Sequence, residues 1–280
     1  MRSLIKNSST RYIISLIMSF ILTLVLTLMT CLIGIYAGFL HDNAVLKRLD
    51  STYFKSLQTV LYDNLESASI PAGIPLETLT DIYPLTMVAL DTKAYAEAIL
   101  AGREYEADST AVSETLKSNV LSYMQSQSIS LTQEQLANLD EFAKQTGADY
   151  TDEIKVPFLT YLVQARNIYA PVMMIGIPVS ILISILISLF LIRLYHFKHK
   201  AVRFLTYSTL SAGLLCIIVP GLVLLTGFYK RINLEPEYFY HFVSGYLSSG
   251  IKVFVILGFL WLLVSAFLIG VTASMKKSVK

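Results

Sequence analysis

The chain has 280 residues, of which 54% are apolar and only 15% charged, a composition typical of a membrane protein and not of a soluble globular domain. The net charge is only +2, but all 20 acidic residues lie between Asp42 and Glu237, so both ends of the chain are purely basic. Basic clusters beside membrane spans account for this asymmetry, and we therefore expect no nucleic-acid partner.

Four long runs without any charged residue predict four transmembrane helices. The shortest has 23 residues, and a helix of that length, at about 1.5 Å per residue, spans a hydrocarbon layer of roughly 30 Å. The first run is far longer than the apolar region of a cleavable signal peptide, so we expect it to remain as a span. The four runs are residues 12–40, 167–192, 204–229 and 253–275.

The segments between the runs predict the orientation. Residues 1–11, 193–203 and 276–280 together hold ten Lys or Arg and no acid, which places them in the cytoplasm. Residues 41–166 and 230–252 then lie on the side of the membrane opposite the cytoplasm. Both cysteines of the chain lie inside uncharged runs, so no disulfide is expected in the outer segments. We predict a multi-pass protein of a bacterial plasma membrane with both termini in the cytoplasm.

The large outer segment, residues 41–166, predicts a helical extracytoplasmic domain. Apolar residues from Leu46 to Leu65 keep helical spacing and are expected to prolong the first span out of the membrane. No alternating strand pattern occurs. The predicted fold class is therefore all-α: a polytopic membrane protein with four transmembrane helices and a helical extracytoplasmic domain between helices 1 and 2.

Local signals predict where the later helices of this domain begin and end. Asp91 is a candidate N-cap for a helix that Gly102 ends. Thr132 and Gln135 have the spacing of a capping box, for a helix that we expect to end at Gly147.

Residues 230–252 predict a second, aromatic outer loop. Tyr238, Phe242 and Tyr246 lie four positions apart, so a short helix here would present one aromatic face. Aromatic side chains are enriched at membrane interfaces, and we expect this face to rest on the bilayer.

Small residues recur every four positions in the uncharged runs and predict helix packing, because close approach of backbones drives association in lipid. We expect enlargement of Ser184 to Leu to overpack such a contact. The candidate packing positions are Ser15, Ser19, Thr23, Thr27, Gly34 and Gly38 in the first run, Gly176, Ser180, Ser184 and Ser188 in the second, and Gly270 in the fourth.

The chain offers little recognisable chemistry. The four runs contain none of the ionisable residues that mark proton relays or buried catalytic groups in membranes. His196 and His199 have helical metal-pair spacing but only lysines beside them, so we expect their basic loop to contact lipid headgroups. Phosphate-binding glycine loops, HExxH and GxSxG are absent from the sequence. We therefore predict no enzyme, no cofactor and no metal site.

Two acidic groups lie in the predicted outer domain. Asp149, Asp152 and Glu153 lack the spacing of an EF-hand loop and are interpreted as acids at the start of a helix. Glu104, Glu106 and Asp108 lie between two predicted helices, where binding residues often gather, and we predict that they contact a partner. The alternative for these three is a solvated acidic loop.

The order of segments is one span, a large outer domain, two spans joined inside, a short outer loop and a fourth span. This layout is similar to that of bacterial ABC-transporter subunits of the macrolide-export and cell-division type. In that family the outer domain receives a partner and cytoplasmic elements couple to an ATPase. Those subunits usually carry acids and bases together after the second span, whereas residues 193–203 are purely basic.

Two functional hypotheses follow. The first is a non-enzymatic integral membrane protein whose outer helical domain binds a protein or an envelope component, with the four lipid-embedded spans as its scaffold. The alternative is a permease-like subunit of a membrane transport complex. Co-purification of an ATPase discriminates between them, because only the second requires one.

Overall fold

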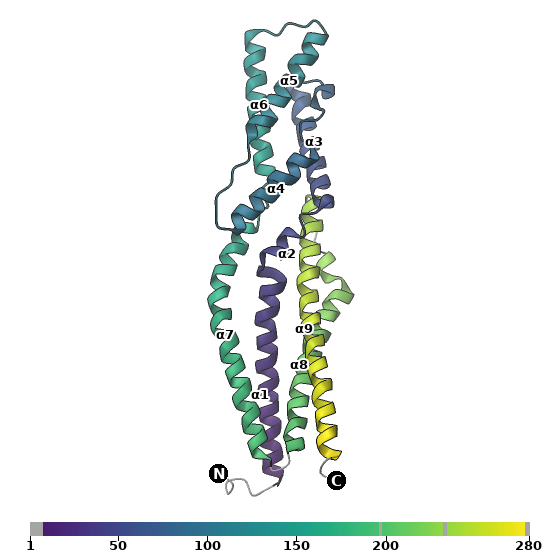
Figure 1. Cartoon of the computed structure of the whole chain (residues 1–280). Helices are drawn as coiled ribbons and strands as arrows, with labels where there is room; N and C mark the ends of the chain where they lie inside the picture. The colour runs from purple at the N-terminus through teal and green to yellow at the C-terminus, as the bar shows by residue number, and fades with distance from the viewer. Residues whose placement is uncertain (1–7, 196–197, 232–233, 278–280) are drawn as a thin grey trace. The chain divides into compact units, whose positions relative to one another are not determined.

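The structure is a computed structural model that describes residues 8–195, 198–231 and 234–277, and every regular element in these ranges is a helix (Figure 1). The chain forms two compact units. The predicted cytoplasmic ends and basic loop fall partly outside the described residues, as does His196. The span unit comprises Met1–Ala44, Ala165–Ile232 and Tyr246–Lys280, and the helical domain comprises Val45–Gln164 and Asn233–Gly245.

Four helices are long and apolar enough to cross a membrane, which confirms the predicted number of candidate spans and the all-α class. Two of them carry short extensions, a π-helical turn after the first and a 3-10 turn after the third. The elements are α1 (Ser8–Ile35) with η1 (Tyr36–Leu40), α7 (Leu159–Leu194), α8 (Lys198–Thr226) with η3 (Phe228–Lys230), and α9 (Glu237–Lys277).

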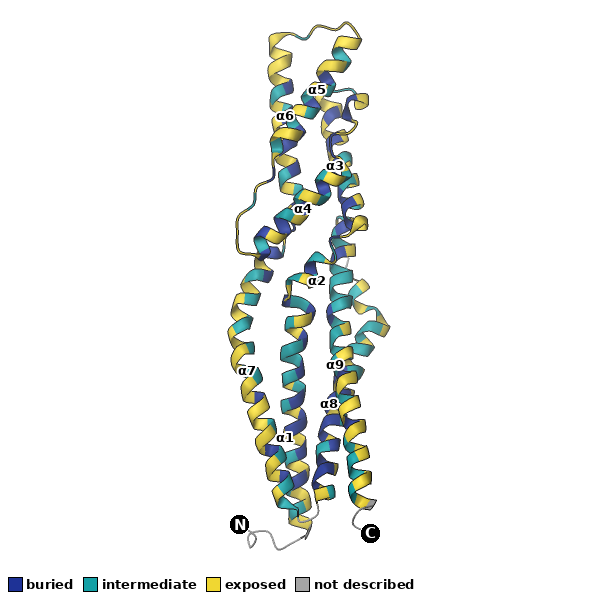
Figure 2. Ribbon diagram, in the orientation of Figure 1, coloured by how far each residue is buried: buried dark blue, intermediate teal, exposed yellow. Residues whose placement is uncertain are grey.

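The span helices leave large apolar side chains uncovered. Figure 2 shows exposed residues along α7 and α9, and the side chain of Leu225 on α8 is 85% exposed. A helix satisfies its backbone hydrogen bonds internally, so such a surface is stable in hydrocarbon although it would be unfavourable in water. The outward faces of these helices are therefore suited to contact with lipid.

In the described residues, the helical domain contains four helices and one short turn that lie wholly within it, together with the first turns of α7 and α9. α5 and α6 lie side by side and are joined as an antiparallel hairpin (Figure 1). On α3, the residues at helical spacing Tyr53, Leu57, Leu61 and Leu65 are all buried in the core. The elements are α3 (Ser51–Ala72), η2 (Leu76–Leu79), α4 (Leu85–Leu100), α5 (Ser109–Ser126) and α6 (Gln133–Glu153).

The expected prolongation of the first span into this domain is wrong. The helix ends with η1, the backbone at His41 is extended, and a one-turn helix α2 (Asp42–Leu46) follows. α3 then begins independently, because the carboxylate of Asp50 accepts hydrogen bonds from the N–H groups of Thr52 (3.0 Å) and Tyr53 (3.1 Å). This is an N-cap: it satisfies the backbone N–H groups that are left unpaired at the start of a helix. Inside a continuous helix, these N–H groups would already be paired.

Asp91 is not an N-cap, contrary to the prediction. α4 already begins at Leu85, after Pro84, so Asp91 lies inside the helix. Its carboxylate accepts hydrogen bonds from the hydroxyls of Tyr150 (2.6 Å) and Tyr105 (3.3 Å). The role of Asp91 is therefore to join α4 to α6 and to the segment after α4.

The capping box at the start of α6 is present. The Thr132 N–H donates to Gln135 Oε1 (2.9 Å), and the Gln135 N–H donates to Thr132 Oγ1 (3.3 Å). The predicted end at Gly147 is wrong, since α6 continues to Glu153. A Cβ added to Gly147 would lie 2.7 Å from the backbone oxygen of Ser109 on α5. This glycine therefore allows two helices to approach closely and does not terminate one.

The predicted aromatic loop is helical from Glu237 onward, and two of the three residues of its expected bilayer face are buried in protein instead. Tyr238 and Phe242 are buried in the helical domain, with ring centroids 5.2 and 5.8 Å from that of Tyr53. Phe242 also lies 5.1 Å from Phe158. Edge-to-face and tilted aromatic pairs of this kind are favourable in a protein core, so the first turns of α9 complete the core of the domain.

Candidate ligand-binding cavity

The predicted acidic loop lies between α4 and α5, and all three of its carboxylates are exposed. Asp108 caps α5 by accepting a hydrogen bond from the Thr110 N–H at 2.9 Å. The hydrogen bonds from Thr110 lower the pKa of Asp108 below its ordinary value. Asp108 thus has a structural role, and only Glu104 and Glu106 remain as carboxylates of this loop without a capping function.

The predicted packing positions of the first two spans are buried or half-buried. Ser19 on α1 donates a hydrogen bond to the Phe204 carbonyl of α8 (3.0 Å) and lies 2.8 Å from Ser208 Oγ. A Cβ on Gly38 would lie 2.8 Å from the Gly250 carbonyl oxygen of α9. Ser15, Thr23, Gly34 and Ser180 are also buried, while Thr27, Gly176, Ser184 and Ser188 are half-buried.

Gly270, the predicted packing position of the fourth run, makes no close helix contact with the residues that the structure describes. It is exposed, and a Cβ added there would meet no atom within 4 Å. The sequence interpretation also missed two residues that these packing positions contact, Ser208 on α8 and Gly250 on α9. Ser208 begins a four-residue repeat with Ala212 and Cys216 that could have marked it. Gly250 has aromatic residues four positions away on either side and therefore belongs to no such repeat.

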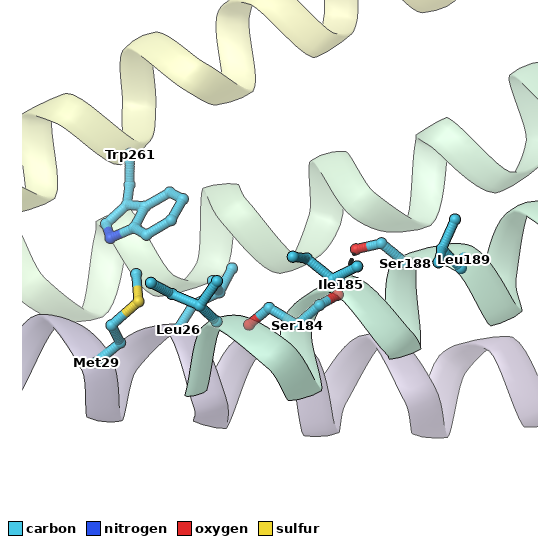
Figure 3. Close-up of a pocket in the computed structure, with 8 residues that line it drawn as sticks. Leu26, Met29, Ser184, Ile185, Ser188, Leu189 and Trp261 are labelled. Carbon is cyan, nitrogen blue, oxygen red and sulfur yellow. Dashed lines mark hydrogen bonds between the residues drawn. The ribbon is translucent and has the colours of Figure 1, made fainter. Parts of the chain in front are cut away.

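A groove of about 300 Å³ lies among α1, α7 and α9 of the span unit (Figure 3). Its few polar groups are already paired: Ser184 Oγ donates to the Ser180 carbonyl (2.8 Å) and Trp261 Nε1 donates to Thr30 Oγ1 (2.8 Å). Among the lining residues, the donors of Ser184, Ser188 and Trp261 are all used within the protein, so none is left to donate to a polar ligand. The groove is lined by Leu26, Met29, Ile181, Ser184, Ile185, Ser188, Leu189 and Trp261.

This groove also changes the expectation for Ser184. Its side chain lies on the wall of an open space (Figure 3), so a larger side chain has room there. We now expect Leu at this position to occupy the groove. Overpacking is expected only where two helices are already in close contact.

The second hollow has a different character. A cavity of about 320 Å³ lies between α3 and α6 in the helical domain, in the size range of small-molecule sites. One side is apolar, with the buried Leu61 and Leu65 of α3, and the other carries carboxylates from α6. The cavity is lined by Leu61, Asn64, Leu65, Ala68, Tyr83, Phe142, Gln145, Thr146, Asp149, Asp152 and Glu153.

Tyr83 is the most firmly held residue of this cavity. Its N–H donates to the Tyr62 hydroxyl (3.2 Å), its carbonyl accepts from Gln58 Nε2 (2.6 Å), and its ring stacks on Tyr150 with centroids 5.6 Å apart. The residue is only 2% exposed, and its hydroxyl has no hydrogen-bond partner among the described residues but keeps access to solvent, since it is not among the buried unpartnered atoms. Burial, and then the charge of Asp149, raise the pKa of Tyr83 above its ordinary value, so the hydroxyl stays protonated.

The three carboxylates lie in the last two turns of α6 and not at a helix start, as the sequence interpretation placed them. Asp149 accepts a hydrogen bond from Gln145 (2.7 Å), and Glu153 accepts one from the Tyr238 hydroxyl (2.8 Å). Asp152 pairs with Lys155 (2.6 Å). Within the described ranges, neither Asp149 nor Glu153 has a cation within 4.0 Å.

Their position gives this end of the cavity a negative charge, with Asp149 and Asp152 exposed to solvent and Glu153 half-buried. The C-terminus of a helix carries a partial negative charge, which basic residues normally compensate, and the last turn of α6 contains none. The carboxylates do not converge on a metal position: in the described part of the chain no three Asp, Glu, His or Cys side chains are grouped to hold an ion.

Comparisons of the chain with protein-family models, with curated proteins and with solved structures find no match. The geometry of its own residues is therefore the basis for the functional argument.

Proposed function

We propose that this protein is a non-enzymatic membrane protein whose helical domain lies outside the membrane and binds a protein or an envelope component, with the four spans as its scaffold. The observation that carries the proposal is the α3–α6 cavity. It combines the Tyr83 hydroxyl, which has no hydrogen-bond partner among the described residues, with an apolar wall and two carboxylates, Asp149 and Glu153, that have no cation within 4.0 Å in the described ranges. Such a mixture fixes the position and orientation of a ligand.

The distribution of charge supports the outward placement of this domain. Residues 193–203, between α7 and α8, contain four basic residues and no acid, and short loops of this kind stay in the cytoplasm. The helical domain precedes α7 and is then on the other side. A bacterial plasma membrane remains part of the proposal, because the domain contains no cysteine for a disulfide.

The spans fit the role of a scaffold. Several of their hydroxyls pair across helices: Ser19 Oγ lies 2.8 Å from Ser208 Oγ of α8, and Ser265 Oγ donates to Thr209 Oγ1 at 2.8 Å. The uncharged runs contain no Asp, Glu, Lys, Arg or His, the residues that usually carry protons in proton-coupled transport. Polar groups used for packing are not available to a substrate.

The placement predicts the result of cysteine labelling in intact cells. In a background without Cys31 and Cys216, a cysteine replacing the exposed Ser126 of α5 is expected to react with an impermeant thiol reagent, whereas one replacing Lys198 at the start of α8 is not. Labelling of Lys198→Cys but not of Ser126→Cys would contradict the proposed orientation. Opening the cells with detergent is the control, because both positions must then react.

The binding role predicts a site-specific cross-link. We expect a photoreactive benzoylphenylalanine in place of Ala68, which lines the cavity, to form an adduct with a cellular component in native membranes. The same group in place of Leu90, which is 68% exposed and does not line the cavity, is the matched control in the same domain and is expected to form none. Adducts from span positions alone, such as Leu225, would count against the proposal.

The alternative, a permease-like subunit of a transport complex, is supported by the order of segments, which is similar to that of the ABC-transporter subunits described above. It requires a cytoplasmic ATPase bound to the spans. Affinity purification from native membranes decides between the two: an ATPase recovered in stoichiometric amount would favour the transport complex.

A further inference from the structure

We propose that the α3–α6 cavity receives an ammonium group carried on an aliphatic stem, of the kind that a lysine side chain presents. The inference rests on the proposed binding function and adds the chemistry of the ligand. Three independent features of the cavity support it: its charge, its apolar wall and the hydroxyl of Tyr83.

The charge of the cavity calls for a cation. Asp149, Asp152 and Glu153 bring three carboxylates to the negative end of α6, and Lys155 compensates only one of them. Charges gathered in this way repel each other and the helix dipole, and a bound cation removes that repulsion. An anionic ligand is excluded by the same argument.

The apolar wall indicates that the cation has a hydrocarbon part. Leu61 and Leu65 of α3 line the cavity across from the carboxylate-bearing helix α6, and Phe142 of α6 adds to the apolar lining. A bare metal ion would gain nothing from such a wall, and hard cations require several converging oxygen ligands. Methylene groups, by contrast, are stabilised by about 0.8 kcal/mol each when they are buried on an apolar surface.

Tyr83 supplies the remaining contact. Its hydroxyl oxygen is a hydrogen-bond acceptor, and an ammonium group has three donors to distribute between that oxygen and the carboxylates. The residue is only 2% exposed, and its hydroxyl has no hydrogen-bond partner among the described residues. The hydroxyl oxygen is not among the buried atoms of the helical domain that lack a partner, so it keeps access to solvent and is free to accept a hydrogen bond from the ligand.

The test uses the full-length protein in lipid nanodiscs and two matched probes. Nα-acetyl-lysine methylamide carries the ammonium group, and Nα-acetyl-norleucine methylamide has a similar stem without the charge. We expect saturation-transfer NMR and titration to show binding of the lysine probe, with the norleucine probe at least about tenfold weaker, as for the loss of one hydrogen bond to a charged group. Equal binding of the two probes would overturn the inference.

Charge variants locate the site. Asp149→Asn and Glu153→Gln keep the side-chain shape, and each is expected to weaken the lysine probe by about tenfold while leaving the norleucine probe unchanged. Asp140→Asn is the matched control on the same helix, because its carboxylate pairs with Lys117 (2.7 Å) and Lys144 (2.8 Å) and does not line the cavity. Unchanged binding in both cavity variants would overturn the site.

Shape variants test the cavity itself. Tyr83→Phe removes only the hydroxyl and is expected to weaken the lysine probe severalfold. Ala68→Trp is expected to block the cavity, whereas Ser67→Trp, next to it on α3 but not lining the cavity, is expected to bind normally. Circular dichroism of each variant checks the fold, and full binding by a folded Ala68→Trp protein would also overturn the inference.

The source of the ammonium group is read from a third probe, 1,5-diaminopentane. Tighter binding of the lysine probe supports a lysine side chain of a partner, and tighter binding of the diamine supports a free amine. The proposed function is tested separately by the cross-link at Ala68. An adduct that persists in the Asp149→Asn, Glu153→Gln double variant would leave the binding function standing and overturn the ammonium assignment, whereas no adduct and no probe binding would overturn both.

Discussion

Replacement of Gly38 by Leu is expected to destabilise the span unit by about 1–3 kcal/mol, the usual cost of overpacking a close contact. A Cβ at Gly38 would lie 2.8 Å from the carbonyl oxygen of Gly250 and 3.0 Å from its Cα. Both are backbone atoms of α9, so neither can rotate away as a flexible side chain would. The measurement is the thermal unfolding midpoint of the full-length protein in detergent.

Gly270→Leu is the control for this prediction, because it makes the same substitution at a predicted packing position where a Cβ meets no atom within 4 Å. We expect its unfolding midpoint to stay at the wild-type value. An equal loss of stability in both variants would contradict the assignment of Gly38 to a helix contact and Gly270 to a surface open to lipid.

Replacement of Asp91 by Ala is expected to lower the free energy of unfolding of the helical domain by about 1.5–3 kcal/mol, the range for hydrogen bonds to charged groups. The carboxylate accepts from Tyr150, which is fully buried, and from Tyr105. Burial, and then the hydrogen bond to Asp91, raise the pKa of Tyr150, so its hydroxyl remains a donor at neutral pH. The loss of stability is measured by amide hydrogen exchange of α4 and α6 in the full-length protein.

Asp91→Ser separates the two interpretations of this residue. Serine is as good an N-cap as aspartate, so it would preserve stability if Asp91 capped a helix. Its shorter side chain carries no charge and only one oxygen, so we expect it to destabilise the domain nearly as much as alanine does. Thr132→Ala, at a cap that the structure does contain, is expected to cost only about 1 kcal/mol and calibrates the measurement.

Features that depend on neighbouring residues could be predicted from the sequence. The four apolar runs form long helices, because a helix pairs the backbone N–H and C=O groups of a segment within that segment. The Thr132 and Gln135 capping box joins residues three positions apart, and both of its hydrogen bonds are present. The burial of Leu57 and Leu61 likewise follows from helical spacing alone.

Features that join distant segments were decided by the tertiary structure. Asp91 has the chemistry of an N-cap, but its position opposite Tyr150, 59 residues later, gives it another role. Gly147 has the chemistry of a helix end, but the approach of α5 keeps it inside α6, and this moves Asp149 and Glu153 to the end of that helix. The cavity exists only because this helix end meets α3 and Tyr83, and no local pattern specifies that encounter.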